Sequence, residues 1–113
     1  MISNLFIMSF RFMRLMLFFD LPTEKSSQRK KYSAFLKNIK KLGFYMLQKS
    51  VYLKLCMDSR MSESIIEQVK NYSPEEGSIA ILTITEKQFS EIRFILGETK
   101  TEILNDNERL VEL

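Results

Sequence analysis

The segment that most constrains the fold is the apolar run FMRLMLFF at residues 12–19, which is followed directly by Asp20, Leu21 and Pro22. A short continuous apolar run that ends at a proline is typical of a strand buried on both sides, because proline stops both strands and helices. We therefore predict a central strand that terminates at Asp20.

Two helices are predicted from apolar residues at three-four spacing. The first begins after Ser26 or Ser27 as N-cap and ends at Gly43. The second covers about residues 62–72 and is followed by a turn at residues 73–77. The apolar residues of the first helix are Tyr32, Phe35, Leu36, Ile39 and Leu42, and those of the second are Ile65, Ile66, Val69 and Tyr72.

Further strands are predicted by β-branched and aromatic residues. Residues 44–55 are predicted to be strand. They contain no Gly or Asn that would mark a turn, so the sequence does not show whether they form a hairpin. Residues 78–85 form a strand with alternating faces. Thr85 and Gln88 have capping-box spacing, which predicts a short helix packed through Phe89 and Ile92. Residues 93–96 and 109–113 are candidates for two more short strands.

This order of elements is that of the split βαβ arrangement. The fold class is therefore α+β, a ferredoxin-like βαββαβ domain with an extra C-terminal strand and both main helices on one face of the sheet. The other face is left open, and in so small a chain a second copy is its natural cover. We expect a homodimer formed through the open face.

Composition excludes several classes of protein. The single cysteine, Cys56, cannot form an intrachain disulfide, which favours a reducing compartment and a cytoplasmic protein. Arg11 and Arg14 interrupt the apolar N-terminal stretch, so we expect neither a signal peptide nor a membrane span. The chain has no histidine, which excludes Ser-His and Cys-His triads and histidine-ligated zinc. Catalysis would depend on carboxylates, hydroxyls and metal.

Charge is distributed unevenly along the chain. Residues 25–57 hold nine basic residues and no acidic one, whereas residues 59–113 hold six basic and eleven acidic residues. Lys30, Lys37 and Lys41 form a stripe on the outer side of the first helix. Such a stripe is suited to a polyanion such as DNA, and it is equally typical of a solvated helix face. Arg11 and Arg14 are further candidates for phosphate contacts, although a strand arginine can instead pair with a carboxylate.

Several segments together resemble one known family. They are RFMRLMLFFDLP at residues 11–22, QKSVY at 48–52, GSIAILTITEKQF at 77–89 and NERLV at 107–111. In this order they are similar to the small dimeric CRISPR-associated spacer-acquisition protein, the second of the two core adaptation proteins, in its type II-A form. The resemblance covers nearly everything after Ser9.

The resemblance implies a homodimer held between two dimers of the larger integrase subunit. This homodimer would cradle duplex DNA for insertion into a CRISPR array. The resemblance also implies that the terminal strand at residues 109–113 adds to the sheet of the partner. Family members are described as magnesium-dependent endonucleases on RNA or DNA, and by this correspondence Asp20 is both the metal ligand and the catalytic residue. A toxin-like ribonuclease or other binding protein of the same fold is a third alternative.

The chemistry of Asp20 leaves two interpretations open. Mg²⁺ commonly binds through one or two carboxylates and water, so Asp20 and its symmetry mate in a dimer could share one ion. Alternatively, Asp20 only terminates the strand and accepts hydrogen bonds from the following turn. Ser50 and Tyr52 are more simply explained by packing than by catalysis.

The expected domain organisation is an extension or alternative start at residues 1–8, the ferredoxin-like domain at 9–96 and a tail at 97–113. Met8 is a candidate for the true start, because the family pattern begins near Met8 and Ser9.

Overall fold

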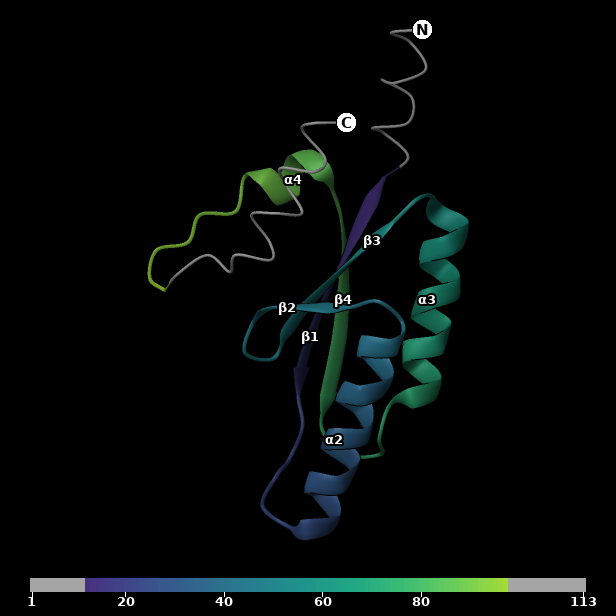
Figure 1. Cartoon of the computed structure of the whole chain (residues 1–113), viewed down its shortest axis with the longest axis vertical. Coiled ribbons are helices and arrows are strands. Elements are labelled where there is room, and N and C mark those ends of the chain that lie inside the picture. The colour runs from purple at the N-terminus through teal and green to yellow at the C-terminus, as the bar shows by residue number, and fades with distance from the viewer. Residues whose placement is uncertain (1–11, 98–113) are drawn as a thin grey trace, which may run out of the picture.

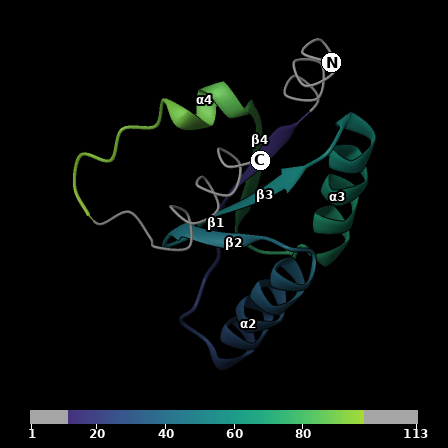
Figure 2. The same cartoon turned by 45° about the horizontal axis from the view of Figure 1, so that its top comes forward.

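The computed structural model describes residues 12–97. In this part of the chain a four-stranded antiparallel sheet has the order β2-β3-β1-β4, with β1 and β3 at its centre. Figures 1 and 2 show α2 and α3 together on one side of the sheet and α4 on the other. This arrangement is the predicted ferredoxin-like α+β fold. The elements are β1 (Met13–Asp20), α2 (Ser26–Lys41), β2 (Tyr45–Gln48), β3 (Val51–Cys56), α3 (Ser59–Tyr72), β4 (Ser78–Thr85) and α4 (Glu86–Ser90).

Strand β1 separates the two faces of the sheet. Because successive side chains of a strand point to opposite faces, Leu15, Leu17 and Phe19 lie on the face that α2 and α3 cover, and all three are buried. Arg14 and Phe18 belong to the other face, where Phe18 keeps 38% of its surface exposed. The central strand is thus confirmed, but only its helix-covered face is buried along the whole length.

The main core lies between the sheet and the two helices α2 and α3. Phe35 and Ile39 of α2 are almost fully buried, as their helical spacing predicts. The ring of Phe19 lies 5.4 Å from that of Phe35 and 5.6 Å from that of Tyr52, measured between centroids. Burying each such side chain stabilises the fold by about 1.5–3 kcal/mol, so this aromatic cluster anchors the end of β1.

Both long helices begin earlier than predicted. The N-cap of α2 is Lys25, not Ser26 or Ser27, and the backbone N–H of Lys25 donates to Gln28 Oε1 at 2.9 Å. Helix α3 starts at Ser59 rather than near residue 62, because the carboxylate of Asp58 caps it and accepts from the backbone N–H of Met61 at 2.8 Å. In each case the first turn is fixed by a polar side chain that precedes the apolar repeat.

Residues 45–56 form a hairpin without glycine or asparagine at its turn. Ser50 takes the left-handed conformation, with φ of 64°, which only a minority of non-glycine residues adopt. The backbone N–H of Phe19 donates to the carbonyl of Ser50 at 3.1 Å, so the turn is attached to the end of β1.

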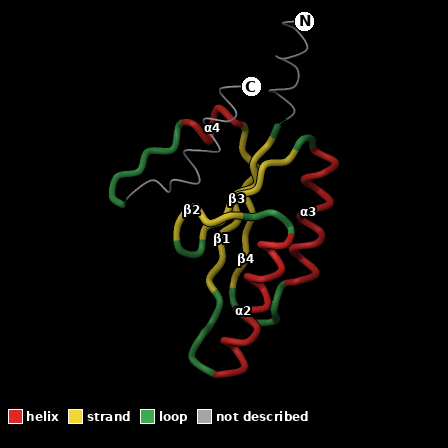
Figure 3. Tube along the Cα trace, viewed as in Figure 1, coloured by secondary structure: helices red, strands yellow, loops and turns green. Residues whose placement is uncertain are grey.

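The short helix α4 is confirmed, with its predicted capping box. Gln88 N–H donates to Thr85 Oγ1 at 3.1 Å, and Thr85 N–H donates to Gln88 Oε1 at 2.9 Å. The prediction of a strand at residues 93–96 was wrong. This segment is a loop beyond α4 (Figure 3), because no strand of the described chain lies beside it to complete a ladder.

Some predictions concern residues outside the described range. These are the extension at residues 1–8, the start at Met8, Arg11, the tail beyond Gly97 and the terminal strand at residues 109–113. Within residues 12–97 no helix has the length and apolar character needed to cross a bilayer.

Candidate functional site

Asp20 lies at the exposed end of β1, on the face of the sheet that α2 and α3 leave uncovered. It pairs with Ser78 at the start of β4. Its neighbours Phe19 and Leu21 are buried, at 5% and 8% exposure, and both belong to the main core. The carboxylate is therefore accessible, while the backbone that carries it is fixed on both sides.

The described part of the chain places no cluster of metal ligands at Asp20. Within residues 12–97 no three Asp, Glu, Cys or His side chains are grouped closely enough to hold an ion. Mg²⁺ commonly takes one or two carboxylates and completes about six oxygen ligands with water or phosphate. Asp20 fits that donor type, and a second Asp20 related by two-fold symmetry would match the usual number of carboxylates.

Arg14 is buried instead of exposed to a nucleic acid. Its side chain has 0% exposure, and its Nε donates to Glu86 Oε1 at 2.8 Å. Its Nη1 donates to the hydroxyl of Tyr45, and its guanidinium lies 4.0 Å from the centroid of the Phe89 ring. Arg14 therefore pairs with a carboxylate, which was the alternative to a phosphate contact. It joins β1, β2 and α4, which is incompatible with the predicted contact to phosphate.

The lysine stripe is exposed as predicted. Lys30, Lys37 and Lys41 all lie on the solvent side of α2, whereas Phe35 and Ile39 are buried on the opposite side. The stripe runs from Lys30 to Lys41, eleven steps along the helix, which is roughly 16 Å at about 1.5 Å per step. Helix α2 carries no acidic side chain, so no carboxylate of the helix itself offsets the charge of the three lysines.

The phenol of Tyr52 and the thiol of Cys56, both on the central strand β3, are packed in the main core. Tyr52 is 4% exposed, and burial raises the pKa of its phenol, with a smaller contribution from Tyr32. Cys56 is fully buried, and burial likewise raises the pKa of its thiol. Both groups remain protonated at neutral pH. Neither is suited to act as a nucleophile, since a reactive thiol needs a lowered pKa.

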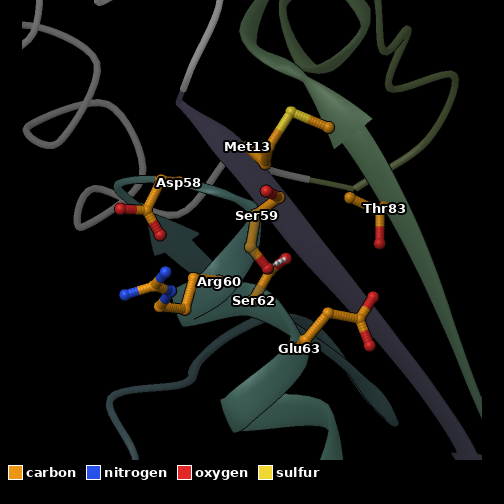
Figure 4. Close-up of a pocket in the computed structure, with 7 residues that line it drawn as sticks. All are labelled: Met13, Asp58, Ser59, Arg60, Ser62, Glu63 and Thr83. Carbon is orange, nitrogen blue, oxygen red and sulfur yellow. Dashed lines mark hydrogen bonds between the residues drawn. The ribbon is translucent and has the colours of Figure 1, made fainter.

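A separate cleft of about 720 Å³ lies at the start of α3 (Figure 4). Asp58 is committed to capping the helix, and the hydroxyl of Ser62 donates to the carbonyl of Ser59 at 2.8 Å. The cleft touches Met13, the first residue of β1, so about seven residues of strand, roughly 23 Å, separate it from Asp20. It is not part of the same site. Its lining residues are Met13, Asp58, Ser59, Arg60, Ser62, Glu63 and Thr83.

Comparison with known proteins identifies the family. The family model described as "CRISPR associated protein Cas2" matches residues 13–92, from the start of β1 to just beyond α4. The chain belongs to the Cas2 family. It is 46% identical to the "CRISPR-associated endoribonuclease Cas2" of Treponema denticola over 101 residues, which cover 89% of this chain and all of that protein. A protein of the same description from Streptococcus mutans is 42% identical, with 89% of this chain and 93% of that protein covered.

A solved structure supports the fold of this Cas2 family member independently. The chain described as "Crystal structure of cas2" aligns with a TM-score of 0.58 at 17% identity, over 80% of this chain and 92% of that chain. The ferredoxin-like architecture is therefore shared. The matched region contains Asp20 and the lysine stripe, while Arg11 lies outside it.

The sequence analysis did not identify the two residues that hold the side chain of Arg14. Glu86 and Tyr45 hold Arg14 although they are 72 and 31 residues away from it. The sequence indicates only that an arginine buried in a strand needs a carboxylate or hydroxyl partner, and it does not indicate which residue that partner is.

Proposed function

We propose that this chain acts as a homodimer in the cytoplasm, where it is the small subunit of a CRISPR spacer-integration complex. In this function it bridges dimers of the larger integrase subunit and cradles duplex DNA. The observation that carries the proposal is the exposed lysine stripe of α2. Duplex DNA has one negative charge per about 1.7 Å of axis, so a basic surface roughly 16 Å long faces several phosphates.

The open sheet face supports the dimer. Phe18 and Leu82 are 38% and 53% exposed, and both are directed away from α2 and α3 by the register of β1 and β4. Exposed apolar side chains grouped on one sheet face favour a protein contact. A second copy on that face would leave the lysine stripes of both chains on the outside, where DNA can reach them.

The DNA-binding proposal is tested by replacing Lys30, Lys37 and Lys41 with glutamine. The loss of three phosphate contacts per chain, and thus six per dimer, should lower the slope of log affinity against log salt by about 5.4, which is about 2.7 for each chain. The matched control replaces Lys70 and Lys87, which are exposed lysines outside α2, and should change the slope little. An unchanged slope in the triple variant would contradict the assignment.

The bridging proposal is tested by capture of the integrase subunit with DNA bound, followed by integration in the reconstituted complex. Asp20→Asn should support integration, because an architectural subunit needs no metal ligand. Failure to associate with the integrase subunit would refute the proposal and favour an unrelated ribonuclease or binding protein of the same fold.

A second candidate function is magnesium-dependent cleavage of RNA or DNA by paired Asp20 residues. It is favoured by the position of Asp20 on the uncovered face and by the endoribonuclease description of the relatives. Asp20 of both chains would hold the ion, which when bound lowers the pKa of a water molecule and polarises the phosphodiester.

The cleavage proposal is tested with Asp20→Asn on single-stranded RNA and duplex DNA in the presence of Mg²⁺. Cleavage should be lost, whereas Glu24→Gln, which removes an exposed carboxylate from the loop after β1, should cleave normally. Cleavage that persists in Asp20→Asn would come from another site or from contamination.

A further inference from the structure

We propose that Gly77 is a positioning residue for Asp20, which rests on the cleavage function proposed above. Gly77 is the residue before β4, and β4 starts at Ser78, the ladder partner of Asp20. The two chain segments therefore meet at the point where the carboxylate is displayed.

The contact between these segments has no room for a side chain. A Cβ atom on Gly77 would lie 2.7 Å from the carbonyl oxygen of Asp20, 2.7 Å from Leu21 Cδ2 and 3.1 Å from Leu21 Cα. Two of these atoms are backbone, so the conflict cannot be relieved by rotating a side chain. It would be relieved by moving the peptide that joins Asp20 to Leu21.

That peptide has little freedom to move without moving the carboxylate. Leu21 is buried in the main core, and the N–H of Phe19 is held by the carbonyl of Ser50. With both neighbours held, a displaced Asp20–Leu21 peptide changes the direction of the Asp20 side chain. Misplacing a reacting group by about 1 Å can reduce a rate by about 100-fold, so Gly77 is expected to affect chemistry more than binding.

Gly43 provides a matched control. Its φ of 101° is nearly that of Gly77, 103°, so alanine suffers the same backbone strain at both positions. At Gly43, however, the new Cβ would meet only the far end of the Lys54 side chain, with Nζ at 2.8 Å. A lysine terminus can move aside, and nothing at Gly43 touches Asp20.

The experiment compares Gly77→Ala with Gly43→Ala in the full chain, and it includes Asp20→Asn. The first readout is the amide resonances of Asp20 and Leu21 in NMR spectra, which should shift in Gly77→Ala and stay in place in Gly43→Ala. The second is cleavage of a single-stranded RNA with Mg²⁺. Gly77→Ala should lower kcat by about 10-fold or more, with KM nearly unchanged, and Gly43→Ala should retain the kcat of the parent.

The outcomes separate the two proposals. If Asp20→Asn cleaves normally, the proposed cleavage function is refuted. The NMR comparison then decides by itself whether Gly77 positions Asp20. If Asp20→Asn is inactive but Gly77→Ala matches Gly43→Ala in both readouts, the inference about Gly77 is overturned. Should Gly77→Ala not fold, Gly77→Asn and Gly43→Asn form the second pair, since asparagine tolerates positive φ better than alanine and still carries the Cβ.

Discussion

The ion pair between Arg14 and Glu86 offers a quantitative test of how α4 is held on the sheet. Arg14 is fully buried, while the Glu86 side chain keeps 27% of its surface exposed, and the Nε–Oε1 distance is 2.8 Å. Glu86→Gln keeps the shape of the side chain and one acceptor oxygen but removes the charge. The guanidinium then remains buried while its ion pair with Glu86 is lost.

The expected cost follows from this partial burial. Removing one member of a fully buried pair costs about 3–5 kcal/mol. Water reaches Glu86, glutamine still accepts a hydrogen bond, and the Phe89 ring remains beneath the guanidinium. We therefore expect Glu86→Gln to lower the free energy of unfolding by about 1–2 kcal/mol.

Urea denaturation measures this change in the free energy of unfolding. The protein concentration is kept fixed, because dimerisation would make the apparent stability depend on concentration. In a double-mutant cycle with Arg14→Met the coupling energy should be about 1–2 kcal/mol. The control is Glu67→Gln, which breaks the exposed 3.6 Å pair with Lys70 and should cost at most about 0.5 kcal/mol. The reasoning is refuted if Glu86→Gln costs no more than Glu67→Gln.

Three further predictions concern the core, a buried thiol and a turn. Phe35→Ala should lower the free energy of unfolding by about 3–5 kcal/mol in urea denaturation, and a loss below about 1 kcal/mol would contradict the packing of Phe35 on Phe19. Burial raises the pKa of the Cys56 thiol from its ordinary value. The folded state therefore keeps the proton at pH values where the unfolded thiol ionises, above about pH 8.5. The free energy of unfolding should therefore fall as pH rises from about 8 to 9.5, and Cys56→Ala should show a smaller fall in the same titration. Ser50→Val should cost about 1–2 kcal/mol more than Ser50→Gly, because valine is strained at positive φ, and equal unfolding midpoints would speak against this turn conformation.

The sequence predicts those parts of the fold that depend on local periodicity. The buried strand ending at Asp20, the apolar face of α2, and the Thr85–Gln88 capping box all follow from side chains a few residues apart. The cap of α3 by Asp58 was also visible locally, but the apolar repeat that follows it begins later and obscured the start of the helix.

The remaining features depend on contacts between distant segments. Ser50 adopts a conformation that its residue type does not favour, and its carbonyl accepts the hydrogen bond from Phe19. The burial of Arg14 requires Glu86, which is brought near only when β4 pairs with β1 and α4 folds back over the sheet. Likewise, the close approach of Gly77 to Asp20 becomes visible only when β1 and β4 are side by side.

The alternation along β1 links these observations to function. Asp20 shares its face with Arg14 and Phe18 because the side-chain period of a strand is two. Helix α4 covers that face at the Arg14 end, through Phe89, and leaves it open toward Asp20. The second copy proposed above would cover Phe18 on the part of this face that α4 leaves open. The same alternation that builds the core thus places the accessible carboxylate on the sheet face that the proposed second copy would cover.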